Sequence, residues 1–467
     1  MEKSMQLKLI GYLLLSMFSF SYLVLAPRAG ISVPIFVLIQ FACLYFLVPR
    51  KKPLFVFIPI FILALNAFLS ANPMWRPWNF FVGIALYSLM ALWLTNSLAI
   101  KENLPQFLLN ICKHVVQACS HFPLPIKWGM QTQKAHMPTI KRVVIGLLIS
   151  LPCLIFLLIM LSLADEIFAR TLDRFFLNFF RLVAFDTIWR AIFGVIAGFY
   201  LFGVLYSVYV PRQKEGPMPR EARRGDLVIL NIVLVSVLLV YTLFVIIQFR
   251  YLFARPDNLP FGLDFVQYAR RGFFELLFLT GVNILFILLA VWLSKDQQGR
   301  GARFTQILSF YLCAVTMVLL ISSFYRMSLY SSDDGLTRLR FLVFGFLIFQ
   351  AIGLIFTFFY ILRPKFNIIA VYTAIALCYY LVLNLVPMDR IIAWDQINRY
   401  LNTGQGGISY TLTLSPDAAP EIARLFESEN AHTRDAARAY LERAASHLEP
   451  ENWRQWNLSI SRLLELR

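Results

Sequence analysis

The chain has 467 residues, of which 59% are hydrophobic and only 15% are charged, so its composition excludes an ordinary soluble domain, in which about 25% of residues carry charge. Its net charge of +17 would suit a nucleic-acid-binding protein, but the positive residues gather in alternate short loops between apolar runs. That pattern is typical of membrane proteins, so we expect membrane lipid and not nucleic acid as a partner.

Long apolar runs recur along the chain, each flanked by charge, and a helix needs about 20 apolar residues to cross a bilayer. They predict an all-α, polytopic helical membrane protein with about 11 transmembrane helices. The first run is too long for a secretory signal and has no cleavage pattern after it, so we expect it to remain as a span. The predicted spans are 7–25, 31–48, 54–70, 79–99, 143–164, 191–210, 227–249, 272–294, 307–329, 341–362 and 367–386.

The lysines give these spans an orientation. With the N-terminus in the cytoplasm, every lysine of the chain falls on the inner side, and the outer loops and the region after Pro387 contain none. Because positive residues stay on the cytoplasmic side, the pattern predicts a cytoplasmic N-terminus and an extracytoplasmic C-terminus.

The inner loop 101–141 contains an amphipathic stretch, 106–121, which we expect on the inner leaflet. Its cysteines and histidines have a metal-like spacing. On a helix, however, Cys112 and Cys119 share one face, and His114 and His121 lie about 200° away from them. We therefore expect no metal site here and no cofactor elsewhere.

A second long inner loop, 211–226, is rich in proline, glycine and charge and predicts a flexible cytoplasmic hinge. It would divide a transmembrane domain, 1–386, into possible halves 1–210 and 227–386. The composition changes after this transmembrane domain, in residues 387–467.

The outer loop 165–190 has the pattern of a helix lying in the membrane interface. Arg170, Arg174 and Arg181 share one stripe, and phenylalanines and leucines occupy the opposite face. One interpretation is a collar that anchors the protein. The other is that these arginines border a site for an anionic group.

After Pro387 the chain becomes charged, rich in alanine and helical in pattern. Residues 388–401 predict an amphipathic helix that 402–407 breaks. Ser415 is a candidate N-cap for a further helix with Pro416 at its first position. Two more helices are expected at 433–447 and 452–466. We expect a small helical extracytoplasmic tail, too short to hold a large core alone.

Polar residues of spans 8, 9 and 10 fall near their predicted outer ends, where consecutive spans are often neighbours. A carboxylate at the mouth of a membrane helix requires a partner, so Glu275 is predicted to lie within salt-bridging reach of at least one arginine. Such a pair could serve only to lock helices together. It could also belong to an outward-facing pocket for a carboxylate or phosphate, because arginine makes bidentate contacts with these groups. The candidate polar site comprises Glu275, Arg270, Arg271, Arg326, Arg338, Arg340 and Asp264.

Several motifs in the second half of the chain resemble a known family. They are YARRGFFELL at 268–277, Tyr330 followed by GLTRLR at 335–340, DRII at 389–392, INRY at 397–400, LSPDA at 414–418 and WRQWNLS at 453–459. In this order they resemble bacterial membrane proteins described as domains of unknown function 4173 and 4153. The resemblance implies a polytopic membrane protein of the bacterial cytoplasmic (inner) membrane, and no activity. One departure is that Ser331 to Asp334 stand where the family has an aromatic residue before Gly-Leu-Thr.

These observations favour a binding, sensing or scaffolding protein with an outward-facing Arg/Glu site for an anionic lipid or glycan. One alternative is a secondary transporter, although no span carries a central charge. A second alternative is a membrane enzyme acting on a lipid-linked substrate. That enzyme would need another acid opposite Glu275, with Asp264, Asp333 and Asp334 as candidates.

Overall fold

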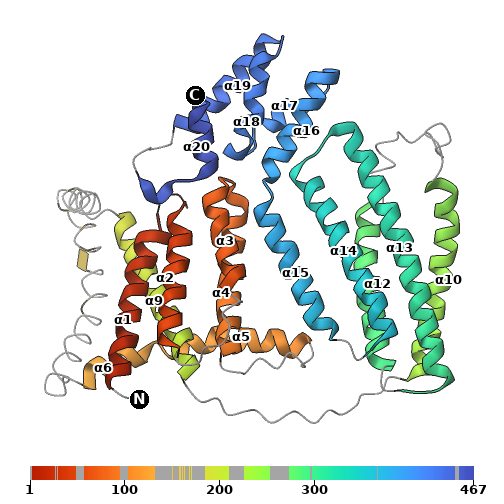
Figure 1. Ribbon diagram of the computed structural model, residues 1–467, viewed down its shortest axis with the longest axis horizontal. Coiled ribbons are helices and arrows are strands. Elements are labelled where there is room, and N and C mark those ends of the chain that lie inside the picture. The colour runs from red at the N-terminus through yellow and green to blue at the C-terminus, as the bar shows by residue number, and fades with distance from the viewer. Residues whose placement is uncertain are drawn as a thin grey trace.

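The computed structural model describes residues 3–26, 28, 30–48, 57–94, 104–131, 150, 157–158, 160, 162, 168, 170, 185–209, 226–252, 273–294, 297–364, 367–446 and 452–466. Regular structure within these ranges is helical throughout, with no strand, as the apolar periodicity predicts. The helices form two bundles with a helical unit at one end (Figure 1). The N-terminus lies at the opposite end of the molecule from that unit.

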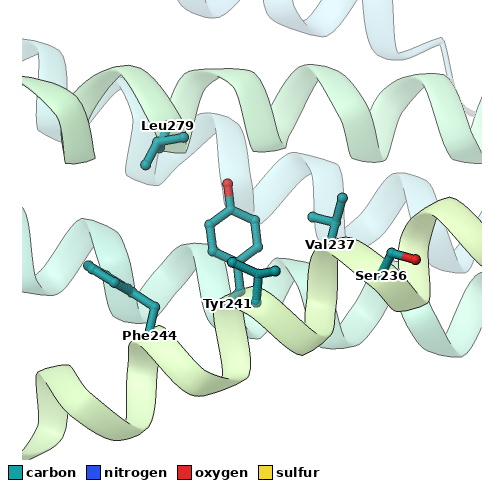
Figure 2. A pocket seen from close by; sticks show the side chains of 6 residues that line it. Ser236, Val237, Tyr241, Phe244 and Leu279 are labelled. Carbon is teal, nitrogen blue, oxygen red and sulfur yellow. The ribbon is translucent and has the colours of Figure 1, made fainter.

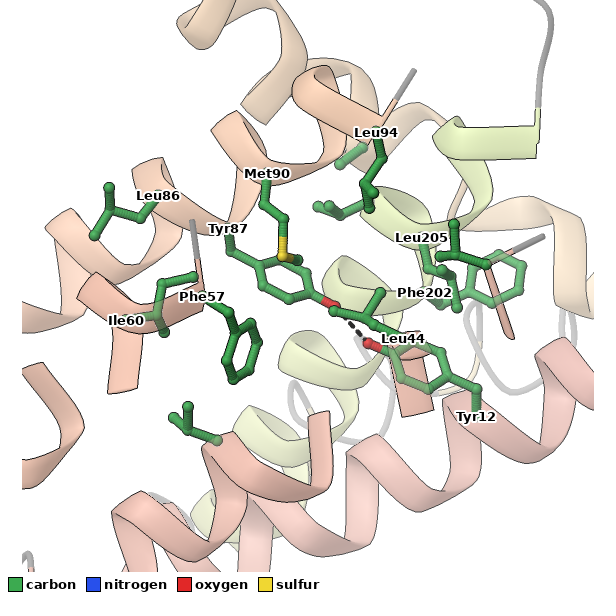
Figure 3. Close-up of a cluster of buried hydrophobic side chains, with 14 of the residues drawn as sticks. Tyr12, Leu44, Phe57, Ile60, Leu86, Tyr87, Met90, Leu94, Phe202 and Leu205 are labelled. Carbon is green, nitrogen blue, oxygen red and sulfur yellow. Dashed lines mark hydrogen bonds between the residues drawn. The ribbon is translucent and has the colours of Figure 1, made fainter. Parts of the chain in front are cut away.

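Within the described residues, the first bundle contains five apolar helices around a buried core. Tyr12 and Tyr87 meet in that core through their hydroxyls, 2.7 Å apart, among Leu44, Phe57 and Leu205 (Figure 3). The Tyr12 hydroxyl donates to Oε1 of Gln40 at 2.7 Å, so Tyr87 is the donor to Tyr12, and these contacts join three helices. The helices are α1 (Lys3–Ser19) with its π-helical end η1 (Phe20–Val24), α2 (Ser32–Leu47), α3 (Phe57–Leu69), α4 (Arg76–Leu94) and α9 (Phe185–Tyr209).

The second bundle is built around one very long helix, α13 (Arg300–Asp334), of 35 residues. At about 1.5 Å per residue this helix is about 52 Å long, more than the 40–45 Å of a whole bilayer. Its end therefore projects beyond the other spans. Packed with it are α10 (Leu227–Leu252), α12 (Phe273–Ser294) and α14 (Arg338–Leu362).

Helix α15 (Ile368–Leu385) runs between the two bundles. Its first residues, including Ile368, pack in the core of the second bundle, and Tyr380 packs against that of the first. Near its end Asn384 accepts a hydrogen bond from Asn79, and Asn66 donates to its carbonyl, both at 2.7 Å. These asparagines join helices, as polar residues in membrane helices commonly do.

Eight helices within the described ranges are long and apolar enough to cross a membrane. They are Lys3–Val24, Pro73–Leu94, Ile188–Tyr209, Leu227–Ile246, Phe274–Ser294, Arg300–Ser332, Arg338–Leu362 and Ile368–Leu385. Two shorter apolar helices, Ser32–Leu47 and Phe57–Leu69, accompany them. Most of the predicted span 143–164 and the hinge 211–226 lie outside the described residues, so the count of about 11 stays a prediction.

Helix α5 (Leu104–Ser120) lies across the end of the first bundle and is followed by α6 (Pro123–Gln131) (Figure 1). Gly203 of α9 has no side chain, and this allows the backbone of Ala118 to approach closely. Beside it, the buried His114 contacts Ser207 with 3.2 Å between Nε2 and Oγ. The Ser207 hydroxyl already donates to the Val204 carbonyl, so this pair anchors α5 and is not arranged as a nucleophile with its base.

The residues after Pro387 fold into a unit with its own core, which includes Ile392, Ile397, Ile422 and Leu463; we refer to residues 388–466 as the C-terminal unit. Its core also takes in Phe341 and Met74 from the two bundles. Gly404 ends the first helix in a left-handed conformation, as the predicted break at 402–407 requires. The elements are α16 (Met388–Thr403), α17 (Ile408–Thr411), η5 (Pro416–Ala418), α18 (Ala419–Ile422), η6 (Ala423–Glu427), α19 (Ala431–Ser446), η7 (Trp453–Gln455) and α20 (Leu458–Glu465).

Candidate functional site

Of the predicted polar site, the described residues Glu275, Arg338 and Arg340 lie at helix ends on the side of the molecule that carries the C-terminal unit (Figure 1). Glu275 lies in the first turn of α12, as predicted, and its side chain is exposed. Arg270, Arg271 and Asp264 are outside the described residues, so a contact between them and Glu275 stays a prediction. Arg326 lies on α13 and is buried.

Arg338 is bound by a carboxylate from the C-terminal unit. Its Nε and Nη2 donate to Oδ1 and Oδ2 of Asp389 at 2.8 and 2.6 Å, a bidentate geometry. The backbone N–H of Ser415 donates to the same carboxylate at 2.9 Å. Asp389 is fully buried, and burial raises the pKa of its carboxyl, but the hydrogen bonds from Arg338 and Ser415 outweigh that effect. The pKa therefore lies below its ordinary value, and Asp389 is held as an anion.

Arg340 is engaged within its own turn. Its Nη2 donates to Asp334 at 2.7 Å, its Nη1 donates to the Gly335 carbonyl, and its guanidinium lies 3.8 Å from the centre of the Tyr330 ring. The arginine is buried, whereas half of the Asp334 side chain is exposed. This arrangement fixes the turn between α13 and α14, and it binds Arg340 to Asp334 rather than to Glu275.

Helix α16 also forms hydrogen bonds with the turn between α13 and α14. Gln396 donates to the carbonyls of Asp334 and Leu336 at 3.1 and 2.9 Å, and Asp395 accepts from the N–H of Leu336 at 2.7 Å. Gly335 has φ +74°, and a Cβ there would lie 2.5 Å from the amide of Gln396. Only glycine fits both the backbone conformation and the close approach.

The C-terminal unit also contacts the first bundle. Asp417 accepts from the hydroxyl of Ser70 and, at 2.6 Å, from the N–H of Ala71, just beyond the end of α3. Asn457 donates to the carbonyls of Ala67 and Ser70, both at 2.9 Å. These carbonyls belong to the last turn of α3 and the residue after it, where a helix leaves acceptors unpaired.

Sequence reasoning missed the roles of Asp389, Asp417 and Tyr440. The first two appeared only as letters in the motifs DRII and LSPDA. Tyr440 donates to the carbonyls of Leu414 and Ser415 at 3.1 and 2.8 Å, and so holds the segment that bonds Asp389. Burial, with the charges of Asp389 and Asp417, raises its pKa. Ser415 occupies the predicted N-cap position, but its side chain makes no capping hydrogen bond.

An open groove lies elsewhere, between α10 and α12 (Figure 2). It has a volume of ≈ 540 Å³, and Tyr241 points from α10 towards α12, where its hydroxyl donates to Asn283 at 2.8 Å. Apart from Ser236 and the Tyr241 hydroxyl its walls are apolar, which suits the lipid-facing surface of a membrane helix pair. It is lined by Ser236, Val237, Val240, Tyr241, Phe244 and Leu279.

The predicted interfacial helix is described only in part. Phe168 and Arg170 are helical, and Arg174 and Arg181 lie outside the described residues. The last residues of the predicted segment, from Phe185, belong to α9. Across the part of the chain that can be placed, no group of three or more His, Cys, Asp or Glu side chains is arranged to hold a metal ion.

Long apolar helices in two bundles define an integral membrane protein. The chain matches the model of the family described as "Domain of unknown function (DUF4153)" over residues 57–425, most of its length, and it belongs to that family. The matched region runs from α3 to η6 and includes Arg338, Asp389 and Asp417. No protein of curated function and no solved structure matches the chain.

Proposed function

We propose that the protein is a binding or scaffolding protein of the bacterial cytoplasmic membrane, with the C-terminal unit on the outer side. The observation that carries this proposal is the double attachment of that unit, through Asp389 to the second bundle and through Asp417 to the first. A unit held to both bundles at one end favours a fixed arrangement of the two.

A transporter that rocks one bundle against the other would have to break one of these attachments in each cycle. Each attachment contains a buried carboxylate that would lose its partners. That cost weighs against the transporter alternative. An enzyme acting on a lipid-linked substrate is also disfavoured, because Asp334, one of the acids suggested as partners of Glu275, is bound to Arg340.

The ligand site that we propose is a polar one around Glu275, with Arg270, Arg271 and Arg326, for an anionic lipid or glycan. Arg338 and Arg340 contribute to this site indirectly, because they fix the turn between α13 and α14. Native mass spectrometry of the protein extracted from its membrane tests this proposal. We expect a retained anionic ligand that is lost from an Arg270→Gln/Arg271→Gln variant.

The matched control is Arg300→Gln/Arg303→Gln. It removes the same amount of charge from the first turn of α13, which is the end of that helix away from the C-terminal unit. A ligand lost equally from both variants, or absent from the parent protein, would contradict the site. Glu275→Gln distinguishes a ligand-binding site from an ion pair that only locks helices together. If Glu275 locks helices, the variant should have reduced abundance. If it belongs to a binding site, the variant should have normal abundance but lack the ligand.

Orientation is tested by fusing alkaline phosphatase at two points. The one-sided distribution of lysines predicts an active fusion after Arg467 and an inactive one after Arg224. The opposite result would place the C-terminal unit in the cytoplasm and remove the outward-facing site.

A further inference from the structure

The C-terminal unit presents an exposed tryptophan surrounded by hydrogen-bonded charges. Arg390, Trp394 and Asn398 follow one another on α16 at intervals of four residues, so they share one face of the helix. Trp394 is the most exposed tryptophan of the C-terminal unit, at 54%. An indole left about half exposed on this helix face requires an explanation.

The charges on either side of Trp394 are linked through one carboxylate. Glu421 of α18 accepts from Nε of Arg390 at 3.1 Å and from Nη1 of Arg424 at 3.2 Å. Nη2 of Arg424 continues to Oδ1 of Asn398 at 2.7 Å. The chain of contacts thus starts one turn before Trp394 and ends one turn after it, which fixes four polar side chains around the indole.

This polar chain has capacity left for a ligand. Two guanidinium groups share one carboxylate, so the group carries one positive charge in excess. Among the described residues, Arg390 donates a hydrogen bond only through its Nε, and its side chain is 42% exposed. Glu421 is 10% exposed at its side chain and is held in position by both arginines.

Trp394 lies after the apolar helix α15, beside the turn between two spans. Helix α15 ends at Leu385, and α16 leads away from that end (Figure 1). Asp395 and Gln396, which follow Trp394, hydrogen-bond the turn between α13 and α14 at Leu336. A tryptophan near the ends of spans can also belong to the lipid headgroup layer, and the brominated-lipid measurement below separates that role from ligand binding.

We propose that this face binds a saccharide that carries a carboxylate or a phosphate group. The indole offers a flat apolar surface for one face of the sugar ring, and Arg390 offers paired donors for the acidic group. The amide of Asn398, one turn beyond Trp394, is placed to bond a hydroxyl group, and Glu421 holds Arg390 and Arg424 in position. The inference deepens the proposed binding role by naming a ligand class and a second site, and it rests on that role only in requiring an extracytoplasmic ligand.

The test is calorimetric titration of the full-length protein in nanodiscs with trigalacturonate and glucose 6-phosphate as acidic probes. Maltotriose is the neutral probe, and inorganic phosphate is the anion without a sugar. We expect an acidic saccharide to bind, with maltotriose and phosphate each at least about tenfold weaker. Trp394→Ala is expected to weaken the acidic saccharide about tenfold, by loss of the stacking surface.

Trp453→Ala is the matched control, because Trp453 is 51% exposed on the same unit but lies on η7, away from Glu421. Equal binding by Trp394→Ala and the parent protein would overturn the proposal, as would failure of both acidic probes to bind. Phosphate that binds as tightly as the acidic saccharides would show an anion site only. Quenching of Trp394 by brominated lipids would assign the indole to the membrane. Either result also overturns the proposal. Retention of an anionic ligand near Glu275 is measured separately, so the two proposals can fail independently.

Discussion

The two attachments of the C-terminal unit use the same acidic residue type in different electrostatic environments. Asp389 meets a guanidinium, so its buried charge has a counter-charge in bidentate contact. Asp417 meets a hydroxyl and a backbone N–H, which are neutral donors at the end of α3. The first attachment is an ion pair, and the second resembles a cap on the first bundle.

This difference predicts which attachment is the more sensitive to mutation. Removing one member of a buried ion pair leaves the other charge without a partner, whereas removing a charge that neutral donors bind leaves only ordinary polar groups. The attachment to the second bundle should therefore depend more strongly on its acid. Four measurements test this difference.

The largest effect is expected for Asp389→Ala. It would leave Arg338 facing a buried, empty position and lower the free energy of unfolding by about 3 kcal/mol, at the low end for buried pairs because Arg338 is 34% exposed. Thermal unfolding in nanodiscs measures the loss. Asp435→Ala, an exposed acid of α19, should change stability by less than about 0.5 kcal/mol.

The double variant Arg338→Met/Asp389→Leu sharpens this test, because it removes both charges together. It should recover much of the stability lost in Asp389→Ala. A double variant as unstable as the single one would show that the ion pair is not the source of the effect.

A smaller effect is expected for Asp417→Asn, which keeps the shape of the side chain and removes its charge. Hydrogen bonds to a charged acceptor are worth about 1.5–3 kcal/mol, and only part of that is lost. Hydrogen exchange should become faster at Ala71 and remain unchanged at Leu336, which bonds Asp395 at the other attachment. Equal acceleration at both amides would mean that the attachments open as one unit.

The smallest effect follows from pH. The pKa of Asp389 is lower in the folded protein than its ordinary value, so its contribution to stability is complete above about pH 5 and is lost as the pH falls below about 4. Between pH 7 and pH 4 the amide of Ser415, which donates to Asp389, should lose protection only slightly, and further acidification should increase the loss. Asp389→Asn should remove this pH dependence, and a variant that retains it would assign the titration to another group.

Much of the fold could be predicted from the sequence, because its signals are local. Apolar runs predicted the helices near their observed positions, and the break at 402–407 coincides with the left-handed Gly404. The candidate site could be predicted only in part. Consecutive spans placed Glu275, Arg338 and Arg340 at one end of the molecule, but the acids that bind these arginines were not identified.

The amino-acid pattern alone is enough to predict a helical membrane protein and the positions of its apolar helices, since helix formation and membrane burial depend on residues close together in the chain. Only the tertiary structure decided that Asp389 binds Arg338, 51 positions away, and that Asp417 binds Ala71, 346 positions away. A buried charge takes whichever partner the folded chain brings within about 3 Å, and that depends on how the C-terminal unit returns onto the two bundles.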